Sequence, residues 1–291
     1  MAKRKKASLP KKGKAAKGKT NTGFFRSLLR WTIFSFSVTL LVIGGCFFYQ
    51  QTSHGSTRNH LAFGTPGRAD RVLSREGYVA GYSTRHRQPR WVIYELKSAD
   101  LAGKRVARTN KFTADRDVPG VPVTPEDYKS SGFDRGHLAP AADMAYSERT
   151  MKESFLMSNM SPQRPEFNRG IWKDLESQIR TFAAAEKDIY VVTGPVLPEI
   201  PAWTIGAQRD ITVPGYFYKV VYDRTPPEKM IAFLLPNAGS SRRLADFAVT
   251  VDTVEAVTGL DFFSEIPKEK QEKLESSITV SAWKWQNFKN R

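Results

Sequence analysis

The amino-acid sequence predicts an α+β domain over residues 72–291, with its strands in a mixed or antiparallel sheet. Short runs rich in aromatic and β-branched residues recur through this part of the chain, which is the composition of β-strands. The connections between them are hairpin-sized or helical, and no strand–helix–strand unit repeats, which argues against a parallel sheet. The chain is 40% hydrophobic and 12% aromatic, which is sufficient for a core and excludes a disordered protein.

The N-terminal segment, residues 1–23, is a Lys-, Gly- and Ala-rich tract with little to bury, so we expect a disordered basic tail. Eleven of the 45 lysines and arginines lie in residues 1–30, which contain no acid, so the rest of the chain carries only +5 of the net charge of +16. The folded part is therefore mildly basic, which permits a basic cleft without demonstrating one. The single cysteine, Cys46, excludes an internal disulfide.

Residues 24–50 contain an expected transmembrane anchor. The run Trp31–Tyr49 has nineteen residues and no charge, and as a helix it would be about 28 Å long, close to the bilayer core of about 30 Å. The positive-inside rule then places the basic tail in the cytoplasm and everything after residue 50 on the other side. A cleaved signal peptide, a lipoprotein cleavage box at Ile43–Cys46 and a mitochondrial presequence are alternatives. The bulky aromatics after Cys46 and the Lys-rich lead disfavour them.

Residues 51–71 are polar, contain several turn-forming residues and show no periodicity, so a linker is expected. His54 and His60 lie in this segment and are expected to be solvent-exposed. His86 lies in the turn Arg85–Arg90 between the first two strands and is expected at the surface.

The strands and helices of the domain are expected from local pattern. Strands are expected at Tyr78–Tyr82, Trp91–Leu96, Ile189–Thr193, Tyr216–Tyr222 and Lys229–Leu235. Helical spacing is found from Asn168 onward, at Thr250–Val257 and at Lys268–Ser276. Residues Ser281–Phe288 form a short aromatic tail.

The helix that begins near Asn168 carries an apolar stripe. Its members are Ile171, Trp172, Leu175, Ile179 and Phe182, which fall within about 100° of arc. Asn168 lies at the centre of that arc, where its amide needs a hydrogen-bond partner, a ligand or the role of an N-cap. Glu176 and Arg180 stand four residues apart on the flank, a spacing that is also typical of an ordinary ion pair on a helix surface.

The tetrad Asp134–His137 reads Asp-Arg-Gly-His. His137 can act as a base near neutral pH, and Arg135 offers a planar fork that suits a phosphate. Gly136 is expected to let the backbone approach a ligand closely. The tetrad therefore points to chemistry on a phosphate ester, although each residue alone has a structural explanation.

Three ordered blocks in this region resemble the DNA/RNA non-specific endonucleases of the ββα-metal (His-Me finger) type, which include secreted bacterial nucleases and mitochondrial endonuclease G. The blocks are Phe133–Pro140 (Phe-Asp-Arg-Gly-His-Leu-Ala-Pro), Ser158–Gln163 (Ser-Asn-Met-Ser-Pro-Gln) and Asn168–Arg180 (Asn-x-Gly-x-Trp-x-x-Leu-Glu-x-x-x-Arg). Weaker matches follow at Thr193–Pro195, Phe217–Lys219 and Leu235–Asn237. The resemblance covers about residues 75–285, so the basic tail and the apolar run lie outside it.

The resemblance implies a base and a metal centre. His137 looks like the general base that takes a proton from the attacking water. Asn168 looks like the only direct protein ligand of one Mg²⁺, with Mn²⁺ as an alternative ion, and waters would complete the coordination. Glu176 would hold one of these waters.

The resemblance also implies a phosphate-binding set of Arg108, Arg135 and Arg180, which would stabilise charge developing on the phosphate. Arg108 is the weakest transfer, because its local pattern is short and Lys111 lies close by. Asp134 is expected to be structural and turned away from the site.

The function implied by the resemblance is Mg²⁺-dependent hydrolysis of DNA and RNA to 5′-phosphate ends by a membrane-tethered, sugar non-specific endonuclease. The domain would face the periplasm or the cell exterior, or the mitochondrial intermembrane space in a eukaryote, and a homodimer is left open. One alternative is a nucleic-acid-binding module on a degenerate nuclease scaffold. Another is a phosphodiesterase acting on small substrates or lipid headgroups.

Overall fold

The computed structural model describes residues 58–208 and 210–286. The expected basic tail, the apolar run Trp31–Tyr49 and the first part of the expected linker lie outside these residues. Within the two described ranges, no helix is both long and apolar enough to cross a bilayer. By its internal contacts the described part is a compact unit that begins at Arg58.

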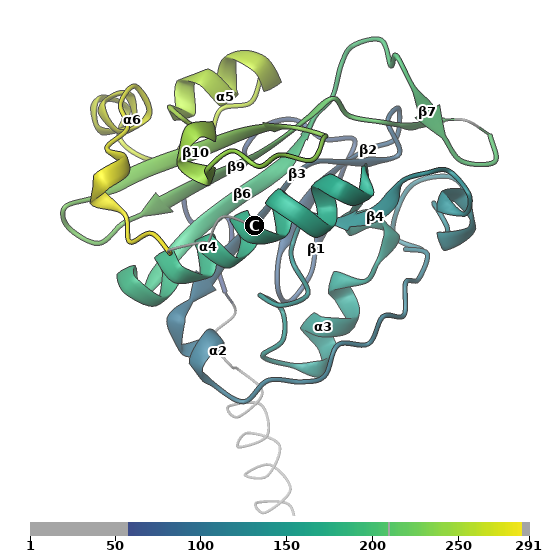
Figure 1. The fold of residues 1–291 in the computed structure, drawn as a ribbon, viewed down its shortest axis with the longest axis horizontal. Helices are drawn as coiled ribbons and strands as arrows, with labels where there is room; N and C mark the ends of the chain where they lie inside the picture. Colours follow the sequence, from purple (N-terminus) through teal and green to yellow (C-terminus); the bar gives the residue numbers. More distant parts are fainter. Residues whose placement is uncertain (1–57, 209, 287–291) are drawn as a thin grey trace, which may run out of the picture. The chain divides into compact units, whose positions relative to one another are not determined.

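A seven-stranded sheet forms the centre of this unit, and its strand order is β1-β2-β3-β6-β9-β10-β11 (Figure 1). Each pair of neighbours is antiparallel. The strands are β1 (Arg71–Ser74), β2 (Val79–Ser83), β3 (Gln88–Lys97), β6 (Asp188–Val196), β9 (Tyr216–Asp223), β10 (Lys229–Pro236) and β11 (Ala248–Val249). All five strands expected from sequence are present, and the mixed α+β class is confirmed.

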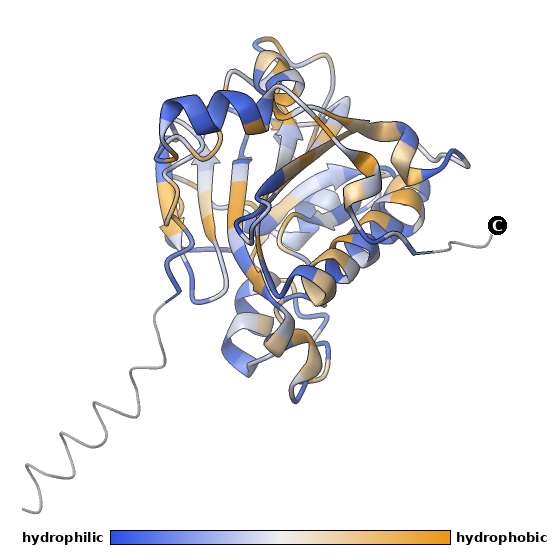
Figure 2. Cartoon of the chain, turned by 90° about the vertical axis from the view of Figure 1, so that its left-hand side faces the viewer, coloured by the Kyte–Doolittle hydropathy of each residue, from blue (hydrophilic) through white to orange (hydrophobic). Residues whose placement is uncertain are grey.

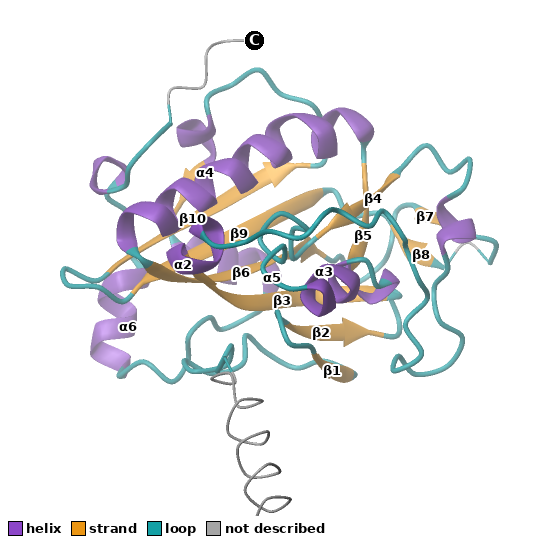
Figure 3. Cartoon of the chain, turned by 90° about the horizontal axis from the view of Figure 1, so that it is seen from below, coloured by secondary structure: helices purple, strands orange, loops and turns teal. Residues whose placement is uncertain are grey.

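Helices cover both faces of the sheet, as Figures 1 and 3 show. Successive side chains of a strand point to opposite faces of the sheet, so the sheet separates two hydrophobic cores. On β6, Ile189 and Val191 pack with helix α4, whereas Tyr190 and Val192 face helices α5 and α6. In Figure 2 orange, hydrophobic residues recur along the strands and on parts of the covering helices, and most loops are blue or pale. The helices are α2 (Ser98–Ala102), α3 (Glu148–Ser154), α4 (Trp172–Glu186), α5 (Val251–Thr258) and α6 (Lys268–Glu275).

Helix α4 buries the apolar stripe expected from sequence, since all five of its members are buried against the sheet. The helix is preceded by one π-helical turn, Phe167–Ile171, in which Gly170 has a non-helical backbone (φ −105°, ψ −115°). Insertions of this kind often occur at functional sites, because they re-aim the side chains at the start of a helix. Asn168 lies in this turn.

A separate two-stranded sheet pairs β4 (Asp134–His137) with β5 (Met160–Gln163), and α4 follows it in the chain, so these elements form a β–β–α unit. A Cβ atom at Gly136 would collide with the side chain of Gln163. The glycine therefore leaves room for the Gln163 side chain between β4 and β5, and close approach of a ligand to Gly136 stays a prediction. A third pair, β7 (Thr204–Ile205) and β8 (Ile211–Thr212), forms a hairpin, and short 3₁₀ turns lie at Pro125–Tyr128, Met157–Asn159, Leu244–Phe247 and Val280–Ala282.

Two expectations of exposed histidines are wrong. His60 is only 4% exposed: it accepts a hydrogen bond from the Glu95 backbone N–H and donates one to the Glu76 carbonyl, each 3.1 Å long. The reason is that the described end of the expected linker packs on the sheet, where Phe63 makes an edge-to-face contact with Tyr190 at 4.8 Å. His86 is also buried, and its Nδ1 lies 2.9 Å from the Thr212 hydroxyl, because strand β8 covers the turn.

Candidate active site

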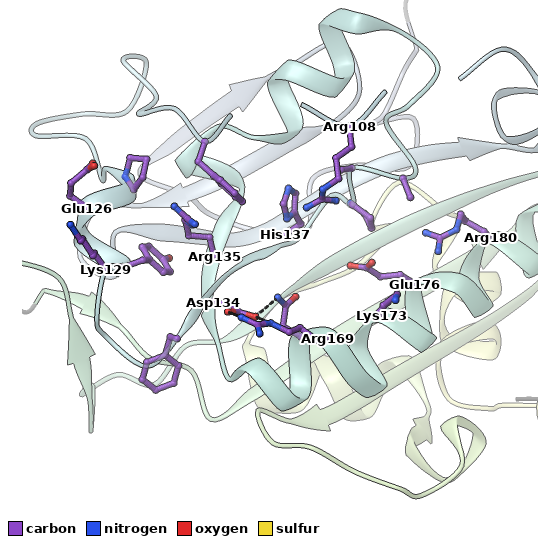
Figure 4. A pocket seen from close by; sticks show the side chains of 18 residues that line it. Arg108, Glu126, Lys129, Asp134, Arg135, His137, Arg169, Lys173, Glu176 and Arg180 are labelled. Carbon is purple, nitrogen blue, oxygen red and sulfur yellow. Dashed lines mark hydrogen bonds and ion pairs between the residues drawn. The ribbon is translucent and has the colours of Figure 1, made fainter. Parts of the chain in front are cut away.

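A pocket of about 770 Å³ lies where β4 meets the start of α4 (Figure 4). All six site residues expected from sequence line it: Arg108, Arg135, His137, Asn168, Glu176 and Arg180. Strand β4 supplies Arg135 and His137. The turn before α4 supplies Asn168, and α4 itself supplies Glu176 and Arg180. An irregular segment supplies Arg108. Lys111, the alternative to Arg108, is not among the lining residues.

His137 is enclosed by aromatic rings. Its imidazole lies 4.8 Å from the ring of Phe155 and 5.6 Å from that of Phe112. Each phenylalanine also carries a guanidinium on its face, since Arg108 lies 4.9 Å from the Phe155 centroid and Arg135 lies 4.2 Å from that of Phe112. The two rings therefore hold the imidazole and position one cation near each ring. Figure 4 shows Arg108 and Arg135 on opposite sides of His137.

The protonation of His137 follows from this enclosure. Burial, together with the charges of Arg108 and Arg135, lowers the pKa of His137 to about 3. The imidazole is therefore neutral at physiological pH and free to accept a proton, and its Nε2 is buried without a hydrogen-bond partner among the described residues. A phosphate anion bound between the two guanidinium groups would offset their charges and raise the pKa again, so the imidazole would become more basic when substrate is present.

The amide of Asn168 is oriented by a carboxylate. Its Nδ2 donates a 2.9 Å hydrogen bond to Asp134, which leaves the amide oxygen available as an acceptor or a metal ligand. Arg169 holds the same carboxylate with two hydrogen bonds of 2.6 and 2.8 Å. Although burial opposes it, these hydrogen bonds lower the pKa of Asp134, so the carboxylate stays charged.

The expectation that Asp134 turns away from the site is wrong, because it lines the pocket and contacts Asn168. Of the roles that the sequence left open for Asn168, the N-cap is excluded, since the cap positions of the π turn and of α4 are Glu166 and Ile171.

Glu176 and Arg180 do not form the helix-surface pair that their spacing allows. Arg180 instead bonds to the buried carboxylate of Asp143 at 2.9 Å, and Asp143 also accepts a 2.9 Å hydrogen bond from Tyr94. Although burial opposes the charged form, the carboxylate of Asp143 raises the pKa of Arg180 and keeps the guanidinium protonated. Burial raises the pKa of Glu176, and the charge of the nearby Lys219 opposes that shift.

Sequence reasoning missed several residues that hold the site together. Asp143 and Phe155 stand in segments with no recognisable motif, so no sequence signal identifies them. Lys219 belongs to the weaker match Phe217–Lys219, but that match assigns no role to it, although a lysine in the middle of an apolar strand is unusual. It is fully buried on β9, where its ammonium lies 4.5 Å from the Trp172 ring and 3.1 Å from the Thr193 hydroxyl.

The donor set of the pocket fits a hard divalent cation. The free amide oxygen of Asn168 and the carboxylate of Glu176 could supply oxygen ligands from one helical segment. A small number of protein ligands suits Mg²⁺, because this ion keeps most of its waters. Three carboxylates outside this pocket are also close enough together to hold a metal ion: Asp252, Glu255 and Glu275. They belong to α5 and α6 on the opposite face of the sheet and do not line this pocket.

Comparison with known proteins gives concordant results. A model of the family described as DNA/RNA non-specific endonuclease matches residues 56–269. A nuclease of Syncephalastrum racemosum is 39% identical over 241 residues, which cover 75% of each chain. Mitochondrial endonuclease G of Homo sapiens is 33% identical over 217 residues, covering 70% of this chain and 73% of that protein. A chain in the crystal structure of the EndoG/EndoGI complex matches with a TM-score of 0.66 at 32% identity, covering 72% of this chain and 92% of that chain.

Proposed function

The chain belongs to the DNA/RNA non-specific endonuclease family and is an endonuclease, and from this premise we propose that it cuts both DNA and RNA by Mg²⁺-dependent hydrolysis. The observation that carries the proposal is the convergence, in one pocket, of a neutral buried imidazole, the guanidinium groups of Arg108, Arg135 and Arg180, and an amide oxygen aligned by a carboxylate. These are the groups that hydrolysis of a phosphodiester requires.

His137 is the general base in this proposal. Arg108 and Arg135 hold the scissile phosphate beside the imidazole, which accepts a proton from the attacking water. Arg180, fixed by Asp143, contacts the phosphate from the α4 side and stabilises the charge that develops on it.

Asn168 and Glu176 are the residues that would hold Mg²⁺, the first directly and the second through a bound water. When bound, the ion would supply Lewis-acid stabilisation of the phosphate and of the departing 3′ oxygen, which leaves a 5′-phosphate. Asp134 keeps the Asn168 amide in the orientation that this role requires.

Tolerance of sequence and sugar follows from contacts that are made to phosphate alone. Such contacts carry no base information, and their contribution falls as salt rises. The family's description covers both DNA and RNA, which supports the same breadth of substrate here.

Tethering to a membrane is part of the proposal and rests on the uncharged run Trp31–Tyr49 behind a lysine-rich lead. The tail would lie in the cytoplasm and the nuclease domain beyond the membrane, in the periplasm or outside the cell. A mitochondrial intermembrane location is the eukaryotic equivalent, and several similar nucleases are named as mitochondrial.

Cleavage of supercoiled plasmid and of a structured RNA tests this function. The full chain should nick the plasmid and degrade the RNA with Mg²⁺, and an excess of EDTA should stop both reactions. End-labelling should find phosphate at the 5′ ends. Retardation of DNA without cleavage would instead favour a binding module on a degenerate scaffold.

A further inference from the structure

A second pocket, of about 450 Å³, adjoins the catalytic one and shares Glu126 and Lys129 with it. It lies between the 3₁₀ turn Pro125–Tyr128 and the β7–β8 hairpin, which projects beside β4 in Figures 1 and 3. Its lining combines hydroxyls and one large aromatic surface: Glu126, Asp127, Lys129, Ser130, Ser131, Trp203, Thr204, Ile205, Gly206 and Ala207. Trp203 is 55% exposed there.

Trp203 is held in place although it is exposed. Its ring meets the ring of Phe133 edge to face at 5.7 Å and 86°, and its carbonyl accepts a 2.9 Å hydrogen bond from the Val213 N–H. The Ala207 N–H donates to the Asp127 carboxylate at 3.3 Å, which ties the hairpin to the turn that lines both pockets. Because the side chain is 55% exposed, much of the indole surface remains available to a ligand.

The charges around Trp203 favour a base over a phosphate at this position. Glu126 and Asp127 would repel an anion, whereas the flat indole and the hydroxyls of Ser130 and Ser131 suit an aromatic, hydrogen-bonding ring. Lys129, at the boundary of the two pockets, can bind a phosphate of the same strand.

The position of Trp203 also suits a nucleotide of the strand that is being cut. Its neighbour Phe133 lines the catalytic pocket and directly precedes β4, four residues before His137. Four residues of extended chain, from Phe133 to His137, span about 13 Å at about 3.3 Å per residue. A strand with stacked bases covers that distance with roughly four nucleotides, at about 3.4 Å each.

We propose that Trp203 is a stacking platform for an unpaired nucleobase a few nucleotides from the scissile phosphodiester. This inference rests on the proposed function, because it takes the strand in the catalytic pocket to be nucleic acid. An aromatic platform accepts any base, so it would strengthen binding of single strands, and of unpaired segments in RNA, without sequence preference. A duplex would gain less, since its bases are already stacked on one another.

Binding of a short fluorescein-labelled oligothymidylate to the full chain in EDTA tests this proposal. Trp203→Ala should weaken binding by about 5- to 150-fold, which is the range for stacking one base on an aromatic side chain. Trp203→Phe should recover part of the loss. Ile200→Ala is the matched control, because Ile200 is 79% exposed on the same segment and lines neither pocket, so its affinity should equal that of the wild type.

A series of oligonucleotides, each with one abasic residue, identifies the stacked base. The wild type should lose affinity when the abasic residue stands at one or two adjacent positions, and Trp203→Ala should show no further loss there. An unchanged affinity of Trp203→Ala, an equal loss on duplex, or no position effect in the wild type would each overturn the platform. Binding is measured without divalent cations, so a failure to cut plasmid with Mg²⁺ would refute the proposed function separately.

Discussion

Replacing His137 by alanine tests the assignment of the base. General-base catalysis contributes about 10²- to 10⁴-fold, so the loss in turnover should correspond to about 2.7–5.4 kcal/mol of transition-state stabilisation. The fold should survive, because the ring contributes two aromatic contacts, to Phe112 and Phe155, each worth about 0.5–1.5 kcal/mol. Affinity for DNA in EDTA should change little, since the guanidinium groups that bind phosphate remain.

The assay is the initial rate of plasmid nicking at saturating Mg²⁺, with thermal unfolding of each variant measured in parallel. His60→Ala is the matched control: it also removes a buried imidazole, but one that bonds to backbone groups and lines no part of the pocket. It should lose stability and keep its turnover at a temperature where it is folded. Turnover of His137→Ala within about threefold of the wild type, or equal losses in the two variants, would refute the assignment.

Three further predictions follow from contacts around β4. Asp134→Ala frees the amide of Asn168 and should raise the Mg²⁺ concentration for half-maximal activity by about 10- to 100-fold; an unchanged Mg²⁺ curve would count against the orienting role. Gly136→Ala should lower the free energy of unfolding in urea by about 1–3 kcal/mol through collision with Gln163, and Gln163→Ala in the same chain should restore part of it. The pKa of His137 is lowered to about 3, so the unfolded state binds more protons between about pH 3 and pH 6.5. The stability of the wild type should therefore fall with decreasing pH across this window, by up to about 1.4 kcal/mol per pH unit relative to His137→Gln, and parallel curves would contradict the lowered pKa.

Much of the fold was predictable because local pattern and tertiary packing agree. The five strands are runs rich in aromatic and β-branched residues, the stripe on α4 has helical spacing, and both kinds of segment are buried in the two cores. The packing of the expected linker could not be predicted in the same way. Phe63 packs on the sheet, but the segment Leu61–Phe63 is too short to show a periodicity. Sequence composition reveals the polarity of such a segment but not which surface covers it.

The residues of the candidate site were predictable as a set, whereas their contacts were not. Arg180 shows why: helical spacing offers Glu176 as its partner, but folding brings Asp143, thirty-seven positions away, to within 2.9 Å. The lowered pKa of His137 is similar, because it depends on Phe112 and Phe155, which are distant in the chain and close only after folding. Long-range contacts of this kind leave no local signal in a single sequence.

The most direct test of the central claim is the Mg²⁺ dependence of plasmid cleavage by Asn168→Ala beside the wild type. The amide oxygen of Asn168, oriented by Asp134, is proposed as the direct metal ligand of the pocket that also contains His137. We predict that the variant binds DNA in EDTA as the wild type does and shows almost no cleavage at Mg²⁺ concentrations that saturate the wild type. Cleavage by Asn168→Ala with an unchanged Mg²⁺ curve would contradict the account.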